Sequence, residues 1–157
     1  MLAKGSEWQR WDLHVHTPET ILNNQYGGWK EYLAAVEANP DVKVIGVTDY
    51  MSIANYSRLK NYKAQGRIRN IDLLVPNIEF RVAPPTDKAT AVNLHILVRP
   101  DAPTHEQEIL DALGRLHWEF NRRRYSCTPP QLMALGRAFS SNASGWPRIG
   151  KQGYRRP

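Results

Sequence analysis

Short apolar stretches recur along the chain, and four of them have the length and composition of β-strands. Residues 11–16 alternate between apolar and polar side chains, which is typical of a strand with one buried face. Residues 43–49, 71–80 and 90–98 are nearly continuous apolar runs rich in Val, Ile and Leu. Such runs predict strands that are buried on both faces.

Four further segments have the periodicity of amphipathic helices. In residues 28–38 the apolar side chains recur at positions i, i+3, i+4 and i+7, which places them on one face. Residues 52–66, 104–120 and 128–139 have a similar pattern, and each begins with Ser or Thr, residues that favour a helix N-cap. We therefore expect helices over these four ranges.

The order of these elements is β-α-β-α-β-β-α-α, which predicts an α/β fold with mostly parallel strands alternating with helices. The chain has 157 residues, 41% of them hydrophobic, enough for one domain with a packed core. We expect residues 1–139 to form this domain. No apolar run approaches the ~20 residues that cross a bilayer, no secretory signal is evident, and Cys127 is the only cysteine. A cytoplasmic protein without membrane contact is expected.

Basic residues are concentrated at the end of the chain. The net charge is +6, and residues 137–157 contain five basic residues and no acidic one. The rest of the chain is nearly neutral, so the basic character alone does not indicate a nucleic-acid partner. Residues 140–157 are rich in Gly, Ser, Pro and Arg and lack any period, which predicts a disordered tail. A tail that contacts nucleic acid, and a truncated or frame-shifted sequence, are the alternatives.

The first predicted strand carries the most specific chemistry. Residues 11–18 read WDLHVHTP, so His14 and His16 are two positions apart and share one face of a strand. Two such imidazoles can bind one metal ion or two neighbouring ions, and zinc, iron and manganese all accept imidazole. The pair alone is equally compatible with a solvated strand face.

Three later strands each add a residue that can bind a metal. Asp49 follows the run VIGVT, Glu79 ends LLVPNI, and His95 lies within NLHILV. A lone charge is costly to bury, so these groups need a partner or a metal. Ligands gather at the carboxyl ends of parallel strands in α/β folds. We therefore favour a metal cluster over separate salt bridges and a satisfied core histidine.

The segments WDLHVHTP, VIGVTDY, VPNIEF and NLHILV, in this order, resemble the motifs of the PHP (polymerase and histidinol phosphatase) family. The resemblance implies a distorted (β/α)7-type barrel, of which this chain would hold a part. It also implies a site with two or three zinc, manganese or iron ions that hydrolyses phosphate esters. The implied metal ligands are His14, His16, Asp49, Glu79 and His95. Glu79 would bridge two ions, and Asp12 would orient an imidazole.

Two departures from the family pattern bear on activity. Tyr50 follows Asp49 where the family usually has a histidine, and a phenol is a better partner for phosphate than for zinc. The later ligands of the family, including an Asp-x-His pair, have no counterpart, since His105 and His117 lie in the predicted 104–120 helix. One metal is therefore expected to be weakly bound or missing, and the barrel to be incomplete.

Three longer segments, NNQYGGWKEYLAAVE, IGVTDYMSIANYSRLK and FRVAPPTDKATAVNLHILV, are similar to one subgroup. This is the N-terminal PHP region of large SMC-like ATPase proteins of the tRNA lesion factor type. The similarity implies that the chain is a fragment of a longer protein, with a fused or associated ATPase region. The nucleotide-binding motif G-x-x-x-x-G-K-[ST] does not occur here, so no nucleotide site is assigned.

Three functions are compatible with these residues. The first is a metal-dependent phosphoesterase in which Arg81 faces the substrate phosphate, with nucleic acid as one candidate substrate. The second is a catalytically silent PHP-like module that binds or regulates partners of an ATPase. The third is a nucleic-acid-binding protein that uses its basic tail. Cys127 is expected to be an ordinary thiol, and residues 122–124, three arginines, to form a solvated turn.

Overall fold

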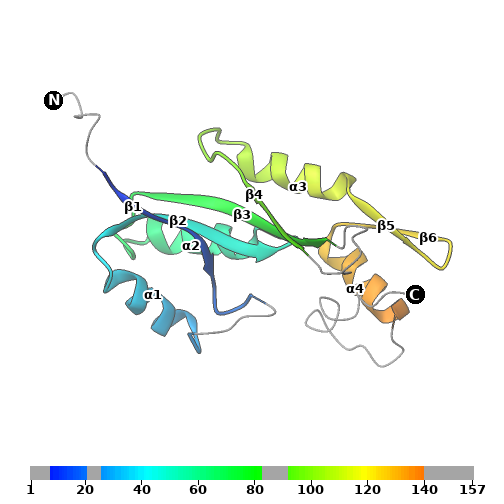
Figure 1. The fold of residues 1–157 in the computed structure, drawn as a ribbon, viewed down its shortest axis with the longest axis horizontal. Coiled ribbons are helices and arrows are strands. Elements are labelled where there is room, and N and C mark those ends of the chain that lie inside the picture. Colours follow the sequence, from blue (N-terminus) through cyan, green and yellow to red (C-terminus); the bar gives the residue numbers. More distant parts are fainter. Residues whose placement is uncertain (1–7, 21–25, 83–91, 140–157) are drawn as a thin grey trace.

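The computed structural model describes residues 8–20, 26–82 and 92–139. The predicted tail, residues 140–157, lies outside this part of the chain. The described residues form a four-stranded sheet and, beside it, a separate two-stranded hairpin (Figure 1).

The first three strands of the sheet are parallel. Strand β1 (Arg10–His16) pairs with β2 (Val42–Tyr50), and β2 pairs with β3 (Leu73–Val82). Helix α1 (Trp29–Glu37) connects β1 to β2, and helix α2 (Ala54–Ala64) connects β2 to β3. The carboxyl ends of the three strands therefore meet at one edge of the sheet, where ligands gather in parallel sheets.

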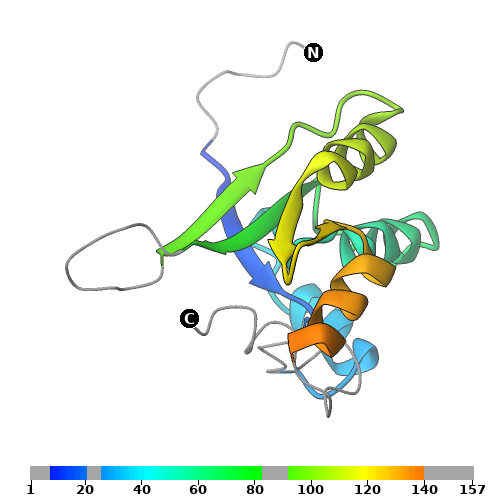
Figure 2. The same cartoon turned by 90° about the vertical axis from the view of Figure 1, so that its right-hand side faces the viewer.

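The fourth strand breaks this arrangement. Strand β4 (Val92–Leu97) runs antiparallel to β3, and the sheet order is β1-β2-β3-β4. A parallel return needs a crossover of about a dozen residues or more, whereas only residues 83–91 separate β3 from β4. The predicted partial (β/α)7-type barrel, with mostly parallel strands alternating with helices, is therefore wrong. The fold is a small mixed α/β domain with a curled four-stranded sheet (Figure 2).

The elements after β4 also differ from the prediction. They are α3 (His105–Arg115), β5 (His117–Phe120), β6 (Arg123–Ser126) and α4 (Pro129–Phe139). The predicted 104–120 helix ends early because Leu116 has extended backbone and a hairpin follows. Asn121 and Arg122 between its strands have φ of 50° and 61°, as in a tight type I′ turn. None of the helices in the described residues combines the length and apolar character that a membrane crossing requires.

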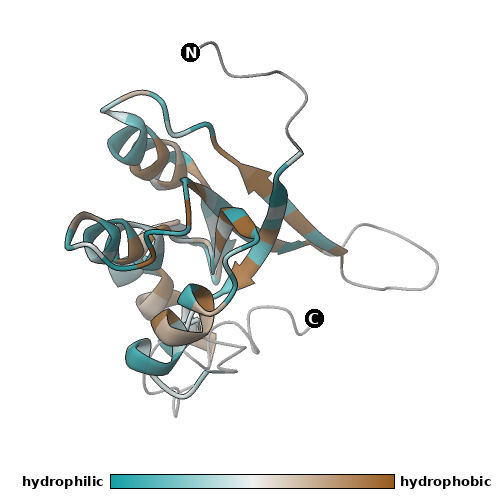
Figure 3. Cartoon of the chain, turned by 90° about the vertical axis from the view of Figure 1, so that its left-hand side faces the viewer, coloured by the Kyte–Doolittle hydropathy of each residue, from teal (hydrophilic) through white to brown (hydrophobic). Residues whose placement is uncertain are grey.

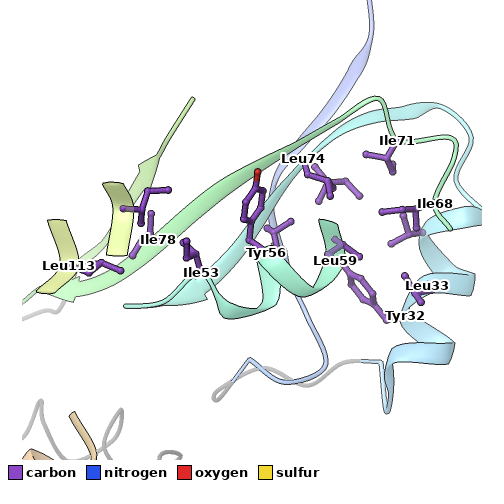
Figure 4. Close-up of a cluster of buried hydrophobic side chains, with 14 of the residues drawn as sticks. Tyr32, Leu33, Ile53, Tyr56, Leu59, Ile68, Ile71, Leu74, Ile78 and Leu113 are labelled. Atoms are coloured by element: carbon purple, nitrogen blue, oxygen red, sulfur yellow. The ribbon is translucent and has the colours of Figure 1, made fainter. Parts of the chain in front are cut away.

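The hydrophobic core lies between the sheet and the helices that connect its parallel strands. Leu33 of α1 and Leu59 of α2 are fully or almost fully buried in one cluster with Ile78 of β3 (Figure 4). Because side chains alternate along a strand, Asn77 and Glu79 on either side of Ile78 point to the opposite face. This second face of the sheet holds the candidate site.

The edge strand β4 leaves much of its apolar surface uncovered. Val92, Leu94, Ile96 and Leu97 are between 43% and 49% exposed. Figure 3 shows β4 as a hydrophobic strand at the margin of the sheet. An exposed apolar edge strand favours pairing with another chain.

Candidate metal centre

Two strands bring three metal-binding side chains together on the face opposite the core. His14 and His16 lie at the carboxyl end of β1, and Glu79 comes from β3. One ligand atom from each residue lies within 4.8 Å of the other two. The two imidazole Nε2 atoms are 3.1 Å apart, and Glu79 Oε2 lies 3.7 Å from that of His14 and 3.5 Å from that of His16. The structure thus brings three of the five sequence-predicted ligands to one point.

A bulge in β1 separates Asp12 from the two histidines. Asp12 pairs with Ile45 and Val15 with Val47, so β1 contains one more residue than β2 over this stretch. The bulge breaks the simple alternation predicted for residues 11–16, and Asp12 lines a shallow hollow beside α1. Its Oδ1 accepts a hydrogen bond from the backbone N–H of His14 at 3.3 Å. Asp12 therefore supports the backbone of His14 rather than its ring.

Glu79 is a buried carboxylate that lacks a hydrogen-bond partner. It is 0% exposed, and neither of its oxygens accepts a hydrogen bond from the described residues. An unpaired buried charge is costly, so buried carboxylates in proteins are usually paired or bind metals. Two imidazoles and one carboxylate form a donor set that suits zinc, manganese or iron.

The two histidines differ in exposure. Burial lowers the pKa of His16, an effect that Glu79 opposes and that His14 and His95 reinforce. The lowered pKa favours the neutral ring, which is the form that binds metals. The side chain of His14 is 52% exposed, against 11% for His16. The cluster is therefore open to solvent on the side of His14.

His95 approaches the cluster from β4. It pairs with Glu79 across the β3–β4 ladder, and its ring meets that of His14 edge-on, with centroids 4.4 Å apart. Its Nδ1 lies 3.2 Å from Oδ1 of Asn77. His95 is not one of the three residues whose ligand atoms lie within 4.8 Å of one another, so it flanks the cluster.

Asp49 points to the opposite face of the sheet. Val47 belongs to the hydrophobic core, and Asp49, two residues later, is on the same side of β2. Its carboxylate accepts hydrogen bonds from the backbone and side-chain N–H groups of Asn55, at 3.0 and 2.8 Å, and from the hydroxyl of Thr20 at 3.2 Å. Burial raises the pKa of Asp49, and these hydrogen bonds oppose the shift. The structure does not bring Asp49 into the three-residue cluster.

Tyr50 and Arg81 lie on the face that holds the cluster. Tyr50 is opposite Glu79 in the parallel register, and its ring stacks on His16 with centroids 5.8 Å apart and an interplanar angle of 18°. Arg81 follows Glu79 by two residues, and its Nε donates to Oδ1 of Asn93 at 3.2 Å. Tyr50 thus contacts the cluster, and Arg81 lies one pleat further along β3.

Asn77 also lies on this face and was not among the residues predicted for the site. It is 2% exposed and hydrogen-bonds to residues of β1, β2 and β4. A signal was present, because Asn77 is a polar residue inside the apolar run LLVPNI and precedes Glu79 by two positions. That spacing places both side chains on one face of a strand.

Cys127 and His105 are two further side chains that can take part in chemistry, and both are buried in the fold. Burial raises the pKa of Cys127 to about 12, so its thiol is unreactive at neutral pH. His105 is buried at the start of α3, where its ring nitrogens bond to the hydroxyl of Tyr56 at 2.9 Å and the carbonyl of Ala102 at 2.6 Å. Neither residue belongs to the cluster.

Three protein ligands with solvent access are typical of catalytic rather than structural metal sites, since an open position remains for water or substrate. The arrangement of His14, His16 and Glu79 fits this pattern. No protein-family model matches the chain, and no curated protein matches it.

Proposed function

We propose that this chain is part of a metal-dependent phosphoesterase, which hydrolyses a phosphate ester with a metal-activated water. The observation that carries the proposal is Glu79, a fully buried carboxylate without a hydrogen bond that faces the Nε2 atoms of His14 and His16. The order of the motifs, which resembles the PHP family, supports phosphate-ester hydrolysis as the reaction.

The residues present fit a divalent metal. His14, His16 and Glu79 would hold one ion, and His95 would bind a further ion beside His14. Zinc, manganese and iron are the metals that accept this mixture of imidazole and carboxylate. A metal bound there would act as a Lewis acid on a phosphoryl oxygen and would lower the pKa of water to about 7.

The chain's own residues bind and orient the substrate. The exposed side of His14 is the entry to the cluster. We assign to the hydroxyl of Tyr50 a hydrogen bond to a phosphate oxygen, because its ring packs on His16. We assign to Arg81 the pairing of its guanidinium with the phosphate charge, because it follows Glu79 on the same face.

Nucleic acid is the substrate class that we propose. Beside the hairpin lies a hollow, here termed the basic hollow, lined by Gly114, Arg115, His117, Arg124, Ser126 and Gln131. These residues offer many hydrogen-bond donors and no carboxylate, which suits phosphate oxygens. The hairpin adjoins the carboxyl end of β2, since Sγ of Cys127 lies 3.9 Å from the carbonyl oxygen of Met51. The basic hollow is therefore the surface to which we assign the phosphates of a nucleic-acid substrate.

The cellular context follows from the same interpretation. We propose that the chain works with a fused or associated ATPase region outside these residues, as the similarity to the tRNA lesion factor type implies. We assign it to the cytoplasm, where a single buried thiol such as Cys127 stays reduced.

A catalytically silent module is the second candidate function, and the position of Asp49 favours it. The hydrogen bonds from Asn55 and Thr20 hold this carboxylate on the face opposite the cluster. Tyr50 occupies the position where the PHP family usually has a histidine. Such a module would bind one metal through His14, His16 and Glu79 and would support a partner without turnover.

Metal titration of the full chain tests the metal site. After removal of metal with a chelator, added Zn²⁺ or Mn²⁺ should bind the wild type and raise its unfolding temperature. Glu79→Gln and His14→Ala should lose this response. Metal-free Glu79→Gln should unfold at no lower temperature than the metal-free wild type, because it removes a buried carboxylate that accepts no hydrogen bond.

Glu119→Gln is the matched control, since Glu119 is an exposed carboxylate in β5. It should respond to metal as the wild type does. A wild type that binds no metal, or a Glu79→Gln that binds it equally well, would refute the metal site. Hydrolysis of an aryl phosphate with added Mn²⁺ then separates the two candidate functions, since metal binding without turnover supports the silent module.

A further inference from the structure

Asn77 joins three strands on the face of the sheet that holds the cluster. Its Nδ2 donates to the carbonyl oxygen of Leu13 in β1 at 2.7 Å and to Oγ1 of Thr48 in β2 at 3.0 Å. Its Oδ1 lies 3.2 Å from Nδ1 of His95 in β4. Because Asn77 is 2% exposed, these contacts take the place of water around its amide.

The neighbouring groups determine which end of the amide faces each strand. The carbonyl of Leu13 can only accept a hydrogen bond. The hydroxyl of Thr48 donates to the carbonyl of Gly46 at 3.3 Å, so it accepts the second N–H of Asn77. Rotating the amide by half a turn would place Oδ1 against the oxygen of Leu13 and lose a donor to it. Oδ1 is therefore the atom that faces β4.

This orientation decides where the proton of His95 lies. Opposite an amide oxygen, Nδ1 of the ring has to donate, and a neutral imidazole with Nδ1–H has a free lone pair on Nε2. We infer that Asn77 is a positioning residue that fixes His95 as the Nδ1–H tautomer and leaves its Nε2 free for a metal ion. The tautomer is a property of the metal-free chain, whereas the role of Nε2 rests on the proposed function.

The same amide also acts on β1. By holding the carbonyl of Leu13, Asn77 restrains the backbone immediately before His14. β1 and β4 are the two outer strands of the sheet, yet the rings of His14 and His95 are only 4.4 Å apart between centroids. Asn77 thus links the backbone carbonyl that precedes His14 in β1 to the ring of His95 in β4 through hydrogen bonds.

Nitrogen NMR of the histidine rings in the full, metal-free chain tests the tautomer. At a pH where the rings are neutral, His95 should carry its proton on Nδ1. Asn77→Leu removes the acceptor at similar size, so His95 should lose this single tautomer, and the affinity for Zn²⁺ should fall about 10–100-fold. Asn77→Asp keeps an acceptor oxygen but loses both N–H donors, so it should keep the tautomer while unfolding more easily.

Thr48→Val is the matched control, because it removes one acceptor of Asn77 but leaves the contact with His95. It should keep the tautomer and most of the Zn²⁺ affinity. A wild-type His95 with its proton on Nε2 would overturn the inference, as would an Asn77→Leu with unchanged tautomer and affinity. If Asn77→Leu does not fold, the tautomer of His95 in the wild type and in Asn77→Asp tests the inference. A wild type with the expected tautomer but without Zn²⁺ binding would confirm the hydrogen-bond assignment and refute the metal-directed role together with the proposed function.

Discussion

Gly46 lies against the backbone of Leu13 where β1 passes β2. A Cβ at position 46 would lie 2.2 Å from the carbonyl oxygen of Leu13 and 2.7 Å from its Cα. These are backbone atoms, which cannot move aside as the end of a flexible side chain can. The close approach of β1 to β2 at the bulge therefore requires glycine at position 46.

Replacement of this glycine should disrupt the metal centre by displacing the backbone of β1 that precedes His14. We expect Gly46→Ala to displace β1, to lower the free energy of unfolding by about 1–3 kcal/mol, and to weaken Zn²⁺ binding. Denaturant unfolding and Zn²⁺ titration measure the two effects. Gly114→Ala in α3 is the control, since a Cβ there meets nothing within 4 Å. Wild-type stability and Zn²⁺ binding in Gly46→Ala would show that β1 does not need this close approach.

The exposed edge of the sheet predicts self-association. Leu94 in β4 is 48% exposed, and β4 has no charged residue to oppose pairing with another strand. We expect the wild type to associate as its concentration rises, and Leu94→Lys to shift it toward the monomer in sedimentation velocity. Leu110→Lys is the control, because Leu110 in α3 is equally exposed but lies away from the edge. A wild type that is monomeric and unfolds cooperatively at every concentration would disprove this prediction.

Local patterns in the sequence were sufficient to place part of the candidate site. The spacing of His14 and His16, and the position of Glu79 at the end of an apolar run, are local features that survive in the fold. The side to which Asp49 points was not predictable in this way. Residues 43–49 form an apolar run without alternation, so nothing in it distinguishes the core face from the site face.

The direction of β4 and the β5–β6 hairpin were missed for related reasons. An apolar run such as residues 92–97 has the same pattern whether the strand is parallel or antiparallel to its neighbour. Only the short separation from β3 indicates the direction of β4. In the hairpin, the helical spacing of Leu113, Leu116 and Phe120 concealed the turn at Asn121 and Arg122. Asn followed by Arg is a weak turn signal, because the second position of this turn usually holds glycine.

An ion pair outside the site predicts a pH dependence of stability. Glu37 at the end of α1 accepts hydrogen bonds from Nε and Nη2 of Arg67, at 2.7 and 2.9 Å, and from the backbone N–H of Ile68 at 2.9 Å. The hydrogen bond from Arg67 is the main cause that lowers the pKa of Glu37 from 4.5 to about 2. A carboxylate with a lowered pKa in the folded state stabilises that state above its unfolded pKa.

The stabilisation by Glu37 should therefore be complete above pH 4.5 and be lost as the pH falls through about 2. Wild type and Glu37→Gln are compared in thermal unfolding across this range. The wild type should unfold at the higher temperature at pH 7, and the difference should shrink below pH 4.5 and vanish below about pH 2. Glu31→Gln, in the exposed first turn of α1, is the control. A difference that stays constant with pH would mean that the charge of Glu37 contributes nothing.

The basic hollow predicts a salt-dependent contact with nucleic acid. Arg115 and Arg124 line it, and both side chains are exposed. We expect the double variant Arg115→Gln, Arg124→Gln to bind a single-stranded oligonucleotide more weakly than the wild type at low salt. Each lost phosphate contact should reduce the slope of log K against log salt by about 1. Fluorescence anisotropy over a range of salt concentrations measures both quantities.

A single control and a deletion decide which part of the chain makes this contact. Arg69→Gln removes an exposed arginine that bonds to the carbonyl of Gly66, on a loop apart from the hollow, and should leave binding unchanged. Deletion of residues 140–157 removes the basic tail but keeps the hollow. If the deletion abolishes binding while the double variant binds like the wild type, the tail is the contact and the hollow has no role. If the deletion lowers the affinity and the double variant still lowers the salt slope, phosphates bind at the hollow, next to the carboxyl end of β2.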